Sequence, residues 1–342
     1  MKIDPLLRAL ADPTRLRIMR LLAHMELAVG ELAQVLGQSQ PRVSRHVRIL
    51  CDAGLTERRK EGSWVFLRSA IGEDRAPPVG AAAAGLLTAA ERDDAAFAAR
   101  CGEDRRHLAA IRAARESSAE AYFARHAQDW DTLRVLHSPD GPVEAALAQA
   151  LGALSVGGDL GSLLDIGTGT GRMAELFAPR AAQVTGLDKS PEMLRIARAR
   201  LQNFPAGHVS LVQGEFTALP FADASFDTVL FHQVLHYALE PEAALVEAAR
   251  VARPGGRIAI VDFAAHDREE LRERHAHARL GFSDEQMLAL LSDAGFAPEP
   301  SIALPGTPLT VKIWTARKDA RRAPGTMPID TPNTERGRAA GR

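Results

Sequence analysis

A short apolar run that ends in three closely spaced glycines constrains the fold of this chain more than any other feature. The run is Leu163-Leu-Asp-Ile-Gly-Thr-Gly-Thr-Gly171, and a helical pattern begins at Arg172. Because glycine adopts backbone angles that strain other residues, such a loop can turn sharply and bring its amide groups close to a ligand. The pattern predicts a strand, a tight loop and a helix. Its G-x-G-x-G spacing differs from the G-x-G-x-x-G of nicotinamide-binding loops.

Short apolar runs alternate with helical stretches from residue 160 onward. Strands that alternate with helices form βαβ units and a parallel sheet. Five strands are predicted at residues 162–166, 182–187, 208–213, 226–231 and 256–262. Two more, at 299–304 and 309–316, follow a predicted helix at 284–294. We therefore expect an α/β domain with a mostly parallel seven-stranded sheet.

Three further motifs follow the glycine loop in chain order. The strand Val184-Thr-Gly-Leu-Asp188 ends in a carboxylate that could accept both hydroxyls of a ribose. Val212-Gln-Gly-Glu-Phe216 offers an acidic and an aromatic side chain to flank an adenine, and Arg253-Pro-Gly-Gly-Arg-Ile-Ala-Ile-Val-Asp-Phe263 is a turn into a buried strand. An isolated aspartate at a strand end is as often a helix cap. Four motifs in order favour a nucleotide-type site instead.

Helical periodicity dominates residues 5–53, before this α/β pattern begins. One helix starts at Asp12-Pro13-Thr14, a second covers 29–36, and a third begins at Ser39. Residues 56–69 then form two β-prone runs around Glu61-Gly-Ser63, which is a hairpin signal. Helices followed by a hairpin predict a winged helix-turn-helix domain.

The third helix of this domain has the pattern of a DNA recognition helix. Val43, Val47 and Leu50 recur at helical spacing and are predicted to face the core. The outward set is Ser39, Gln40, Arg42, Ser44, Arg45, His46 and Arg48, and the wing adds Arg58, Arg59 and Lys60. Arg and Gln can bond base edges, while other basic side chains hold phosphates. A basic face can also be merely solvated, but residues 1–75 carry 13 Lys and Arg against 9 Asp and Glu, which favours DNA.

The N-terminal motifs resemble the ArsR/SmtB family of bacterial repressors. The resemblance rests on Leu10-Ala-Asp-Pro-Thr-Arg-Leu-Arg-Ile18 and Ser39-Gln-Pro-Arg-Val-Ser-Arg-His-Val47, and it covers residues 1 to about 75. It implies a homodimer that reads a palindromic operator in double-stranded DNA. Arsenite-sensing relatives carry Cys-x-Cys in the second helix of the motif, where this chain has Leu27-Ala-Val-Gly30. Thiolate metal sensing is therefore not expected.

The later motifs together resemble the class I S-adenosylmethionine (SAM) dependent methyltransferases, especially their small-molecule and quinone-type branch, over residues 160–316. The resemblance implies Asp165 and the glycine loop near the methionine part of SAM, Asp188 on the ribose, and Glu215 with Phe216 at the adenine. The predicted cofactor-binding set is Asp165, Gly167, Thr168, Gly169, Gly171, Asp188, Lys189, Met193, Gly214, Glu215, Phe216 and His232. We expect SAM or S-adenosylhomocysteine (SAH) to bind there, without a metal. Relatives more often show Gly-Asp-Ala where this chain has Gly214-Glu-Phe216.

Few sequence features identify the residues that would catalyse methyl transfer. Methyl transfer from a sulfonium needs alignment of donor and acceptor, and a base only if the acceptor must lose a proton. Candidate catalytic residues are His232, His236 and Tyr237, which follow the fourth strand. His266, His275 and His277 occupy the segment after the fifth strand, which often covers the acceptor. A single histidine is as readily a surface or capping side chain.

Two kinds of acceptor are disfavoured. The segment Phe231-His-Gln-Val-Leu-His-Tyr237 lacks the Asn/Asp-Pro-Pro-aromatic tetrapeptide of amino-directed nucleic-acid methyltransferases. Cys51 and Cys101 are the only cysteines, which are too few and poorly placed for cytosine C5 chemistry or arsenite methylation. The acceptor is therefore expected to be another small molecule.

Two hypotheses for the whole chain remain. The first is a DNA-binding regulator, a repressor as the resemblance implies, whose methyltransferase domain methylates a small molecule. The second is a repressor of methyl-metabolism genes that senses SAM or SAH without turnover. A sensor needs coupling between its domains, and the helical region 81–152 is the predicted place for it. Tyr122, Phe123 and Trp130 in this region could cover the cofactor, although core packing explains them equally well.

The domain organisation follows from these patterns. We expect a winged helix-turn-helix domain at 1–75, a helical linking, dimerising and cofactor-covering region at 76–155, a SAM-binding domain at 156–317 and a disordered tail at 318–342. No apolar stretch approaches the length of a membrane span, and the first residues lack the apolar core of a signal peptide. Together with the scarcity of cysteine, this predicts a cytoplasmic protein without membrane contact.

Overall fold

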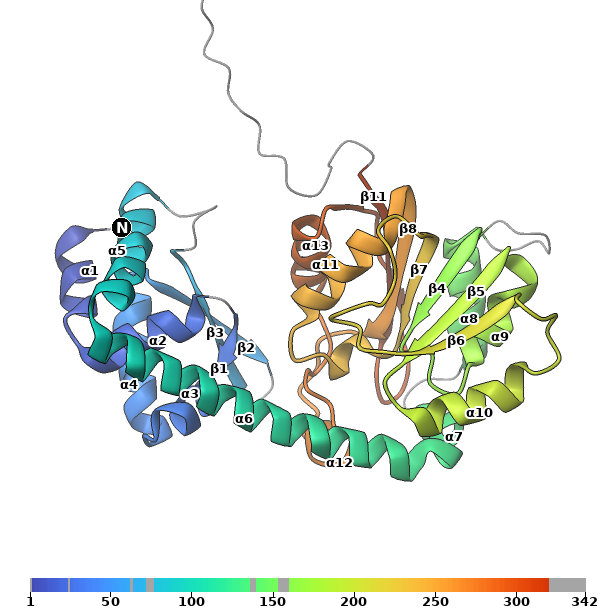
Figure 1. Cartoon of the computed structure of the whole chain (residues 1–342), viewed down its shortest axis with the longest axis horizontal. Coiled ribbons are helices and arrows are strands. Elements are labelled where there is room, and N and C mark those ends of the chain that lie inside the picture. The colour runs from blue at the N-terminus through green and yellow to red at the C-terminus, as the bar shows by residue number, and fades with distance from the viewer. Residues whose placement is uncertain are drawn as a thin grey trace, which may run out of the picture.

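The computed structural model of this chain describes residues 2–23, 25–61, 64–71, 77–135, 140–152 and 160–319. A small helical unit with a hairpin lies at one end of the molecule, and a larger α/β unit lies at the other (Figure 1). One long helix runs along both units and connects them (Figure 1). The fold class predicted from the sequence is confirmed.

The small unit is a winged helix-turn-helix. Its helices are α1 (Ile3–Leu10), α2 (Pro13–Leu22), α3 (Val29–Leu36) and α4 (Gln40–Asp52), and its strands are β1 (Leu27–Ala28), β2 (Thr56–Glu61) and β3 (Trp64–Ser69). Asp12 caps α2 by accepting a hydrogen bond from the backbone N–H of Arg15 at 3.0 Å. Gly37, with φ of 61°, ends α3 in the left-handed conformation and starts the turn into α4.

The core of this unit follows the predicted apolar pattern. Val43, Val47 and Leu50 of α4 are buried, and they pack in one cluster with residues of α2 and α3 such as Ile18 and Leu32. The three strands form an antiparallel sheet in the order β1-β3-β2. Residues 62 and 63 of the predicted hairpin turn lie outside the described residues.

Four helices lie in the region that the sequence predicts to be helical. They are α5 (Pro78–Asp93), α6 (Ala95–His126), α7 (Trp130–Val135) and α8 (Asp140–Ala150), with a single 3₁₀ turn, η1 (Ala127–Asp129), before α7. α6 contains 32 residues and is about 48 Å long at the rise of an α-helix. Asp94 caps it by accepting hydrogen bonds from the N–H groups of Ala96 and Phe97. This length lets α6 contact both units.

The large unit is built on one mixed sheet. Its strands are β4 (Ser162–Ile166), β5 (Gln183–Asp188), β6 (Val209–Gln213), β7 (Phe226–His232), β8 (Ala252–Phe263), β9 (Phe296–Pro298), β10 (Ile302–Leu304) and β11 (Val311–Lys318). Seven of them follow the order β10-β11-β8-β7-β4-β5-β6, and β9 pairs with β11 as an eighth. The sequence analysis missed β9. Strands β4 to β8 pair in parallel, whereas β9, β10 and β8 pair antiparallel with β11.

Helices cover both faces of this sheet (Figure 1). They are α9 (Arg172–Phe177), α10 (Pro191–Leu201), α11 (Pro241–Val251), α12 (Glu270–His275) and α13 (Asp284–Asp293), with 3₁₀ turns η2 (Ala178–Arg180) and η3 (Leu235–Tyr237). Neighbouring strand residues alternate between two cores: Val229 packs with the α11 and α13 side, and Leu230 with the α8, α9 and α10 side. Strands buried on both faces explain the continuous apolar runs in the sequence.

β11 extends one residue into the predicted tail, and residues 320–342 lie outside the described residues. No helix in the described part of the chain is long and apolar enough to cross a bilayer.

Candidate cofactor site and candidate DNA interface

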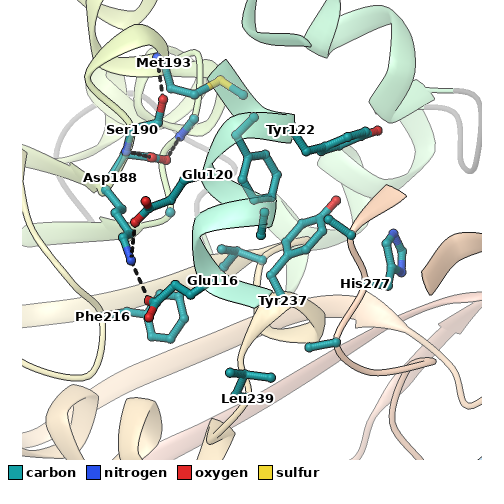
Figure 2. Close-up of a pocket in the computed structure, with 18 of the residues that line it drawn as sticks. Glu116, Glu120, Tyr122, Asp188, Ser190, Met193, Phe216, Tyr237, Leu239 and His277 are labelled. Carbon is teal, nitrogen blue, oxygen red and sulfur yellow. Dashed lines mark hydrogen bonds and ion pairs between the residues drawn. The ribbon is translucent and has the colours of Figure 1, made fainter. Parts of the chain in front are cut away.

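A large cavity of about 1470 Å³ opens at the carboxyl ends of the parallel strands. Its floor includes the loops after β4, β5 and β7, and residues of α6 and α7 form the opposite wall. The strand order reverses between β4 and β7, and the crevice at such a point is where ligands bind in open α/β sheets. Figure 2 shows part of this cavity, with Asp188 and Met193 on one side and Tyr122 and Tyr237 on another.

The glycine loop forms the turn that the sequence predicts. Gly167 and Gly169 have φ of 71° and 56°, a region that other residues rarely adopt. A Cβ atom on Gly167 would overlap the side chain of Val234. The N–H groups of Gly167 and Thr168 both donate to the carbonyl of Leu187, at 2.8 and 2.9 Å. The loop is therefore pinned to β5 and leaves bare backbone at the cavity.

Asp165 is a buried carboxyl group with one oxygen free to bind a ligand. Its Oδ2 accepts a hydrogen bond from Thr168 Oγ1 at 2.6 Å, while Oδ1 has no partner among the described residues. Burial raises the pKa of this carboxyl group to about 7. A buried oxygen without a partner is costly unless a ligand donates to it. A cationic amino group, such as that of the methionine part of SAM, fits this position.

Arg134 of α7 lies in the same cavity, and the sequence analysis did not identify it. Its Nη2 donates to Asp140 at 2.7 Å, and its buried Nη1 has no partner among the described residues. Asp165 and Arg134 thus offer one anion and one cation, which suit an amino acid with both ammonium and carboxylate groups. No motif marks Arg134, because it reaches the site from a helix outside the sheet.

Asp188 stands at the end of β5, as predicted, and is held by backbone groups. Its Oδ2 accepts from Gly169 N–H and its Oδ1 from Ser190 N–H, both at 2.8 Å. Burial raises the pKa of its carboxyl group, although these backbone hydrogen bonds act in the opposite direction. Each oxygen keeps a second lone pair, so the carboxylate can still accept the two hydroxyls of a ribose. Met193 is buried in the neighbouring wall (Figure 2).

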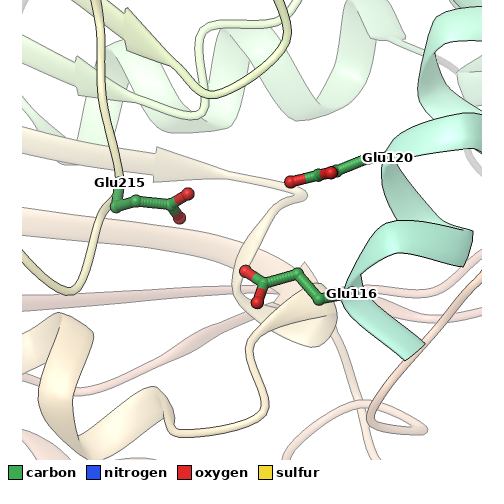
Figure 3. A group of neighbouring side chains, drawn as sticks. All are labelled: Glu116, Glu120 and Glu215. Atoms are coloured by element: carbon green, nitrogen blue, oxygen red, sulfur yellow. The ribbon is translucent and has the colours of Figure 1, made fainter. Parts of the chain in front are cut away.

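Lys189 and Glu215 meet at the predicted adenine end of the cavity, together with two glutamates of α6. The Lys189 ammonium lies 2.5 Å from Glu116, 2.6 Å from Glu120 and 2.8 Å from Glu215. Although burial lowers the pKa of Lys189, the three carboxylates raise it more. Figure 3 shows the three carboxylates facing one another, at a spacing that could hold a cation. Since the Lys189 ammonium group already pairs with all three, they do not by themselves indicate a metal site.

The remaining predicted adenine residues also line the cavity. Phe216 is half-buried there, and Gly214 lies so close to Leu187 and Pro220 that a Cβ atom would crowd them. Gly171, with φ of 84°, instead lies at the start of α9 and packs against Ala197 and Leu201 of α10. Its role is to bring α9 and α10 together.

The three candidate catalytic residues occupy different environments. His232 ends β7 in the cavity, and burial lowers the pKa of its ring to about 3, so the ring is neutral at physiological pH. Tyr237 of η3 lines the cavity, with its ring edge-on to Phe123 at a centroid distance of 4.8 Å. His236 is buried and contacts Asp262 of β8 at 2.7 Å. Asp262 belongs to the fourth motif, but the sequence analysis did not identify it as a site residue.

The aromatic residues of the helical region form the outer wall of the cavity. Tyr122, Phe123 and Trp130 all line it, and Tyr122 Oη lies 2.9 Å from His275 Nδ1 in α12. Trp130 Nε1 lies 3.6 Å from where a Cβ atom on Gly169 would stand. This wall supports the prediction that the helical region covers the cofactor.

The predicted recognition helix α4 presents most of its outward set to solvent. Gln40, Arg42, Ser44, Arg45 and Arg48 are exposed, as are Ser39 before the helix and Arg58 and Lys60 on β2. His46 is half-buried, with Nδ1 3.6 Å from Asp12, because its side chain turns back towards the start of α2. The structure therefore corrects the prediction that His46 points outward.

Arg59 is the second residue on this surface whose side chain does not point where the sequence predicted. Its guanidinium group donates to Glu26 at 3.0 Å and to Glu61 at 2.7 Å, and it lies over the ring of Phe66. These partners draw Arg59 away from the DNA face of the wing and towards the large unit. Of the three cations predicted to contact DNA from the wing, only Arg58 and Lys60 are therefore exposed.

The wing contacts the segment that follows β8 in the large unit. Glu61 Oε1 accepts from Arg272 at 2.5 Å and from the N–H of Leu280 at 2.7 Å, and Glu26 accepts from Arg279 at 2.9 Å. The guanidinium of Arg272 lies 4.4 Å from the ring centre of Trp64. Glu26, Trp64, Arg272 and Arg279 also line the large cavity, so both units contribute to its wall.

We expect the buried Asp165 to make the affinity for SAM depend on pH. A cationic ligand requires the carboxylate form, so binding below the pKa of about 7 must release a proton. We expect the dissociation constant to rise about tenfold for each pH unit below that pKa and to level off above it. Calorimetry across this range measures the slope. Asp165→Asn should flatten it, and an unchanged slope in that variant would exclude Asp165 as the titrating group.

Comparison with protein families matches both units separately. Residues 12–58 match the family model for bacterial regulatory proteins of the arsR family, and residues 164–260 match a methyltransferase domain model. An uncharacterized 37.1 kDa protein in transposon TN4556 of Streptomyces fradiae is 33% identical over 196 residues, which cover 53% of each chain. A demethylmenaquinone methyltransferase of Tropheryma whipplei is 42% identical over 101 residues, which cover 30% of this chain and 41% of that enzyme. The aligned part of this chain thus spans about half of the length of these curated relatives, or less.

Solved structures of methyltransferases are similar to somewhat more than half of this chain. A putative methyltransferase from Bacillus halodurans has 22% sequence identity and a TM-score of 0.46, covering 52% of this chain and all of that one. A SAM-dependent methyltransferase from Thermotoga maritima has 23% identity and a TM-score of 0.46, covering 59% of this chain. One polypeptide thus joins a segment that matches the family model for bacterial regulatory proteins of the arsR family to a segment that matches a methyltransferase domain model.

Proposed function

We propose that this chain is a transcriptional regulator whose methyltransferase domain binds SAM and methylates a small molecule. The main observation behind this proposal is the large cavity, which Asp165, Arg134 and Asp188 line together with the glycine loop. Bound SAM supplies a methyl group on a sulfonium, which is a strong electrophile. The residues of this chain would hold its amino-acid part, orient its ribose and keep water from the methyl group.

Methyl transfer is tested by SAH formation. SAM with an isotopically labelled methyl group is incubated with the full chain and a panel of phenols, amines, thiols and quinones. The expected result is labelled product together with an equal amount of SAH. Tight SAM binding without SAH formation on any acceptor would overturn the enzymatic proposal.

A homodimer is the second part of the proposal. α1 and α5 lie at the end of the molecule far from the α/β unit (Figure 1). Both helices have exposed apolar side chains. Leu7 of α1 is 53% exposed and Leu86 of α5 is 58% exposed. Such side chains gain most from burial against a second copy of the chain. Two copies of α4 would then read a palindromic operator, with repression as the expected outcome.

A SAM- or SAH-sensing repressor of methyl-metabolism genes without turnover is the alternative function. The observation that favours it is the direct contact between the wing and the cavity wall, through Glu61, Arg272 and Leu280. α6 provides a second connection, because Arg115 pairs with Glu31 of the small unit at 2.7 Å and Glu116 pairs with Lys189. The sequence analysis predicted coupling through the helical region alone.

Operator affinity with and without ligand tests this coupling. DNA sites are first selected from a random duplex pool, and their affinity is then measured with no ligand, with SAM and with SAH. A sensor predicts a several-fold change, and the operator should change the affinity for SAM by the same factor. Glu61→Gln should reduce the change, whereas Glu57→Gln, on the exposed side of the same strand, should not. Equal operator affinity at saturating ligand would contradict the sensor.

A further inference from the structure

A buried histidine and aspartate form a pair beside the cofactor cavity. His236 of η3 and Asp262 of β8 are 2% and 0% exposed. Asp262 Oδ1 lies 2.7 Å from His236 Nδ1, and its Oδ2 accepts the backbone N–H of His236 at 3.1 Å. Because a carboxylate only accepts hydrogen bonds, His236 Nδ1 carries the proton and donates it. In the neutral ring, Nε2 therefore holds a lone pair.

The lone pair of His236 Nε2 has no partner among the described residues. The ring lines a second, small cavity of about 20 Å³. Six residues line both this cavity and the large one, namely Tyr122, Trp130, Arg134, Gln233, Tyr237 and His277. A base with a free lone pair thus stands one layer of side chains away from the predicted methyl-donor site.

The position of His236 in the fold agrees with an acceptor site. η3 follows β7 directly, and the end of β7 forms part of the cavity floor through His232 and Gln233. Gln233 has φ of 52°, an unfavourable conformation for a residue other than glycine. Backbone strain of this kind concentrates at functional sites. The chain turns there so that η3 lies over the crevice.

We propose that His236 is the general base of methyl transfer and that the acceptor is a hydroxyl group on a planar aromatic or enolic ring. The inference rests on the proposed methyltransferase function. His236 Nε2 takes the hydroxyl proton while the acceptor oxygen forms a bond to the methyl carbon. The electron pair of the breaking carbon–sulfur bond stays on sulfur, which leaves neutral SAH. Asp262 holds the ring and stabilises the imidazolium, which then releases the proton to solvent.

The walls of the small cavity indicate this acceptor class. The rings of Tyr122, Trp130, Tyr237 and Phe263 surround the space, and such rings favour a planar partner. Arg134 is the only residue of this wall with a permanent charge, and Asp262 is engaged by His236 and by the N–H of Phe263 at 2.8 Å. An ammonium acceptor would therefore meet no free anion in this wall. A hydroxyl group needs none.

The acceptor must open this wall to reach His236, since about 20 Å³ holds no ring. The contact between Tyr122 Oη in α6 and His275 Nδ1 in α12 ties together the two helices on either side. Its release would merge the two cavities. Tyr122→Phe should therefore lower KM for a bulky phenol several-fold.

The test combines binding and turnover on the full chain. The first probe is a nitrophenol whose ionised form absorbs visible light, titrated into protein saturated with SAH. The wild-type protein should ionise the bound probe at a pH below its pKa in solution, and His236→Gln should not. His208→Gln serves as the matched histidine control, because His208 precedes β6 at the amino ends of the strands and lines neither cavity. Loss of ionisation in both variants, or in neither, would overturn the role of His236.

Turnover gives the second readout. His236→Gln should lower kcat on phenols at least 100-fold while SAM affinity changes less than twofold. Asp262→Asn should shift the pH profile of kcat clearly and raise KM only slightly, as expected for a positioning residue. The titratable groups that lie around His236, and can therefore influence this pH profile, are Asp262, His266, His277 and Tyr237.

Methylation of amines but not phenols, or phenol turnover that survives His236→Gln, would overturn the inference. Absence of SAH formation on every acceptor would overturn the methyltransferase proposal itself.

Discussion

Replacing Asp188 with alanine is expected to weaken SAM binding by roughly 100-fold or more. The ribose hydroxyls of SAM would lose the carboxylate that accepts their two hydrogen bonds, and hydrogen bonds to a charged group contribute about 1.5 to 3 kcal/mol each. The N–H groups of Gly169 and Ser190 would also lose their acceptor, so the glycine loop would be held less firmly. Isothermal calorimetry with SAM and with SAH measures the loss.

Two comparisons make this result specific. Asp188→Asn keeps the shape of the side chain and should lose less affinity than the alanine variant, because its amide oxygen still accepts one hydroxyl. Glu242→Ala, an exposed carboxylate of α11, should leave SAM affinity unchanged. Unaltered SAM binding in Asp188→Ala would remove Asp188 from the cofactor site and weaken the assignment of the whole cavity.

Replacing Arg45 with alanine is expected to abolish operator binding under conditions where the wild-type protein is saturated. Arg45 is exposed near the middle of α4, where a guanidinium can bond a guanine edge or a phosphate. A good bidentate contact contributes about 1 to 3 kcal/mol, and a dimer loses it at both half-sites. The expected loss is therefore roughly 100-fold or more. Fluorescence anisotropy at fixed salt measures it, since protein–DNA affinity depends steeply on salt.

The controls for Arg45 separate base or phosphate contact from total charge. Arg100→Ala removes an exposed cation from α6, outside the helix-turn-helix, and should barely change operator affinity. SAM affinity should be the same in Arg45→Ala as in the wild type. Equal losses from Arg45→Ala and Arg100→Ala would mean that net charge, rather than α4, drives DNA binding. A change in SAM affinity only when operator is present would reveal coupling between the domains.

The local patterns predicted the elements of both domains well, because each pattern has a local physical cause. Asp12-Pro13 starts a helix through a side-chain cap and a preset backbone angle, and neither depends on the rest of the fold. The apolar strand runs reflect burial between two helical layers, which the parallel sheet requires. β9 was missed because its three residues, Phe296–Pro298, are too short for any periodicity and pair only with the end of β11.

The candidate site divides in the same way. Asp165 and Asp188 stand at the carboxyl ends of β4 and β5, and Gly169 lies in the loop after β4, so the topology of a parallel sheet brings them to one edge. Arg134 and Glu116 reach the cavity from helices outside the sheet, and their positions depend on how those helices pack. Helix packing is decided by side chains far apart in the sequence, such as Asp131 and Arg200, which join α7 to α10. No local pattern contains that information.

Sequence alone therefore determined the two kinds of domain, their order along the chain and the loop that faces the cofactor, since short-range backbone preferences and apolar periodicity suffice for these. Tertiary structure alone decided the direction of the side chains that serve more than one element. Arg59 was predicted to meet DNA, yet it turns to Glu26 and Glu61 because a buried carboxylate needs a cation. His236 was one of several histidines until β8 placed Asp262 against it. Both outcomes depend on charges that meet only after the chain has folded.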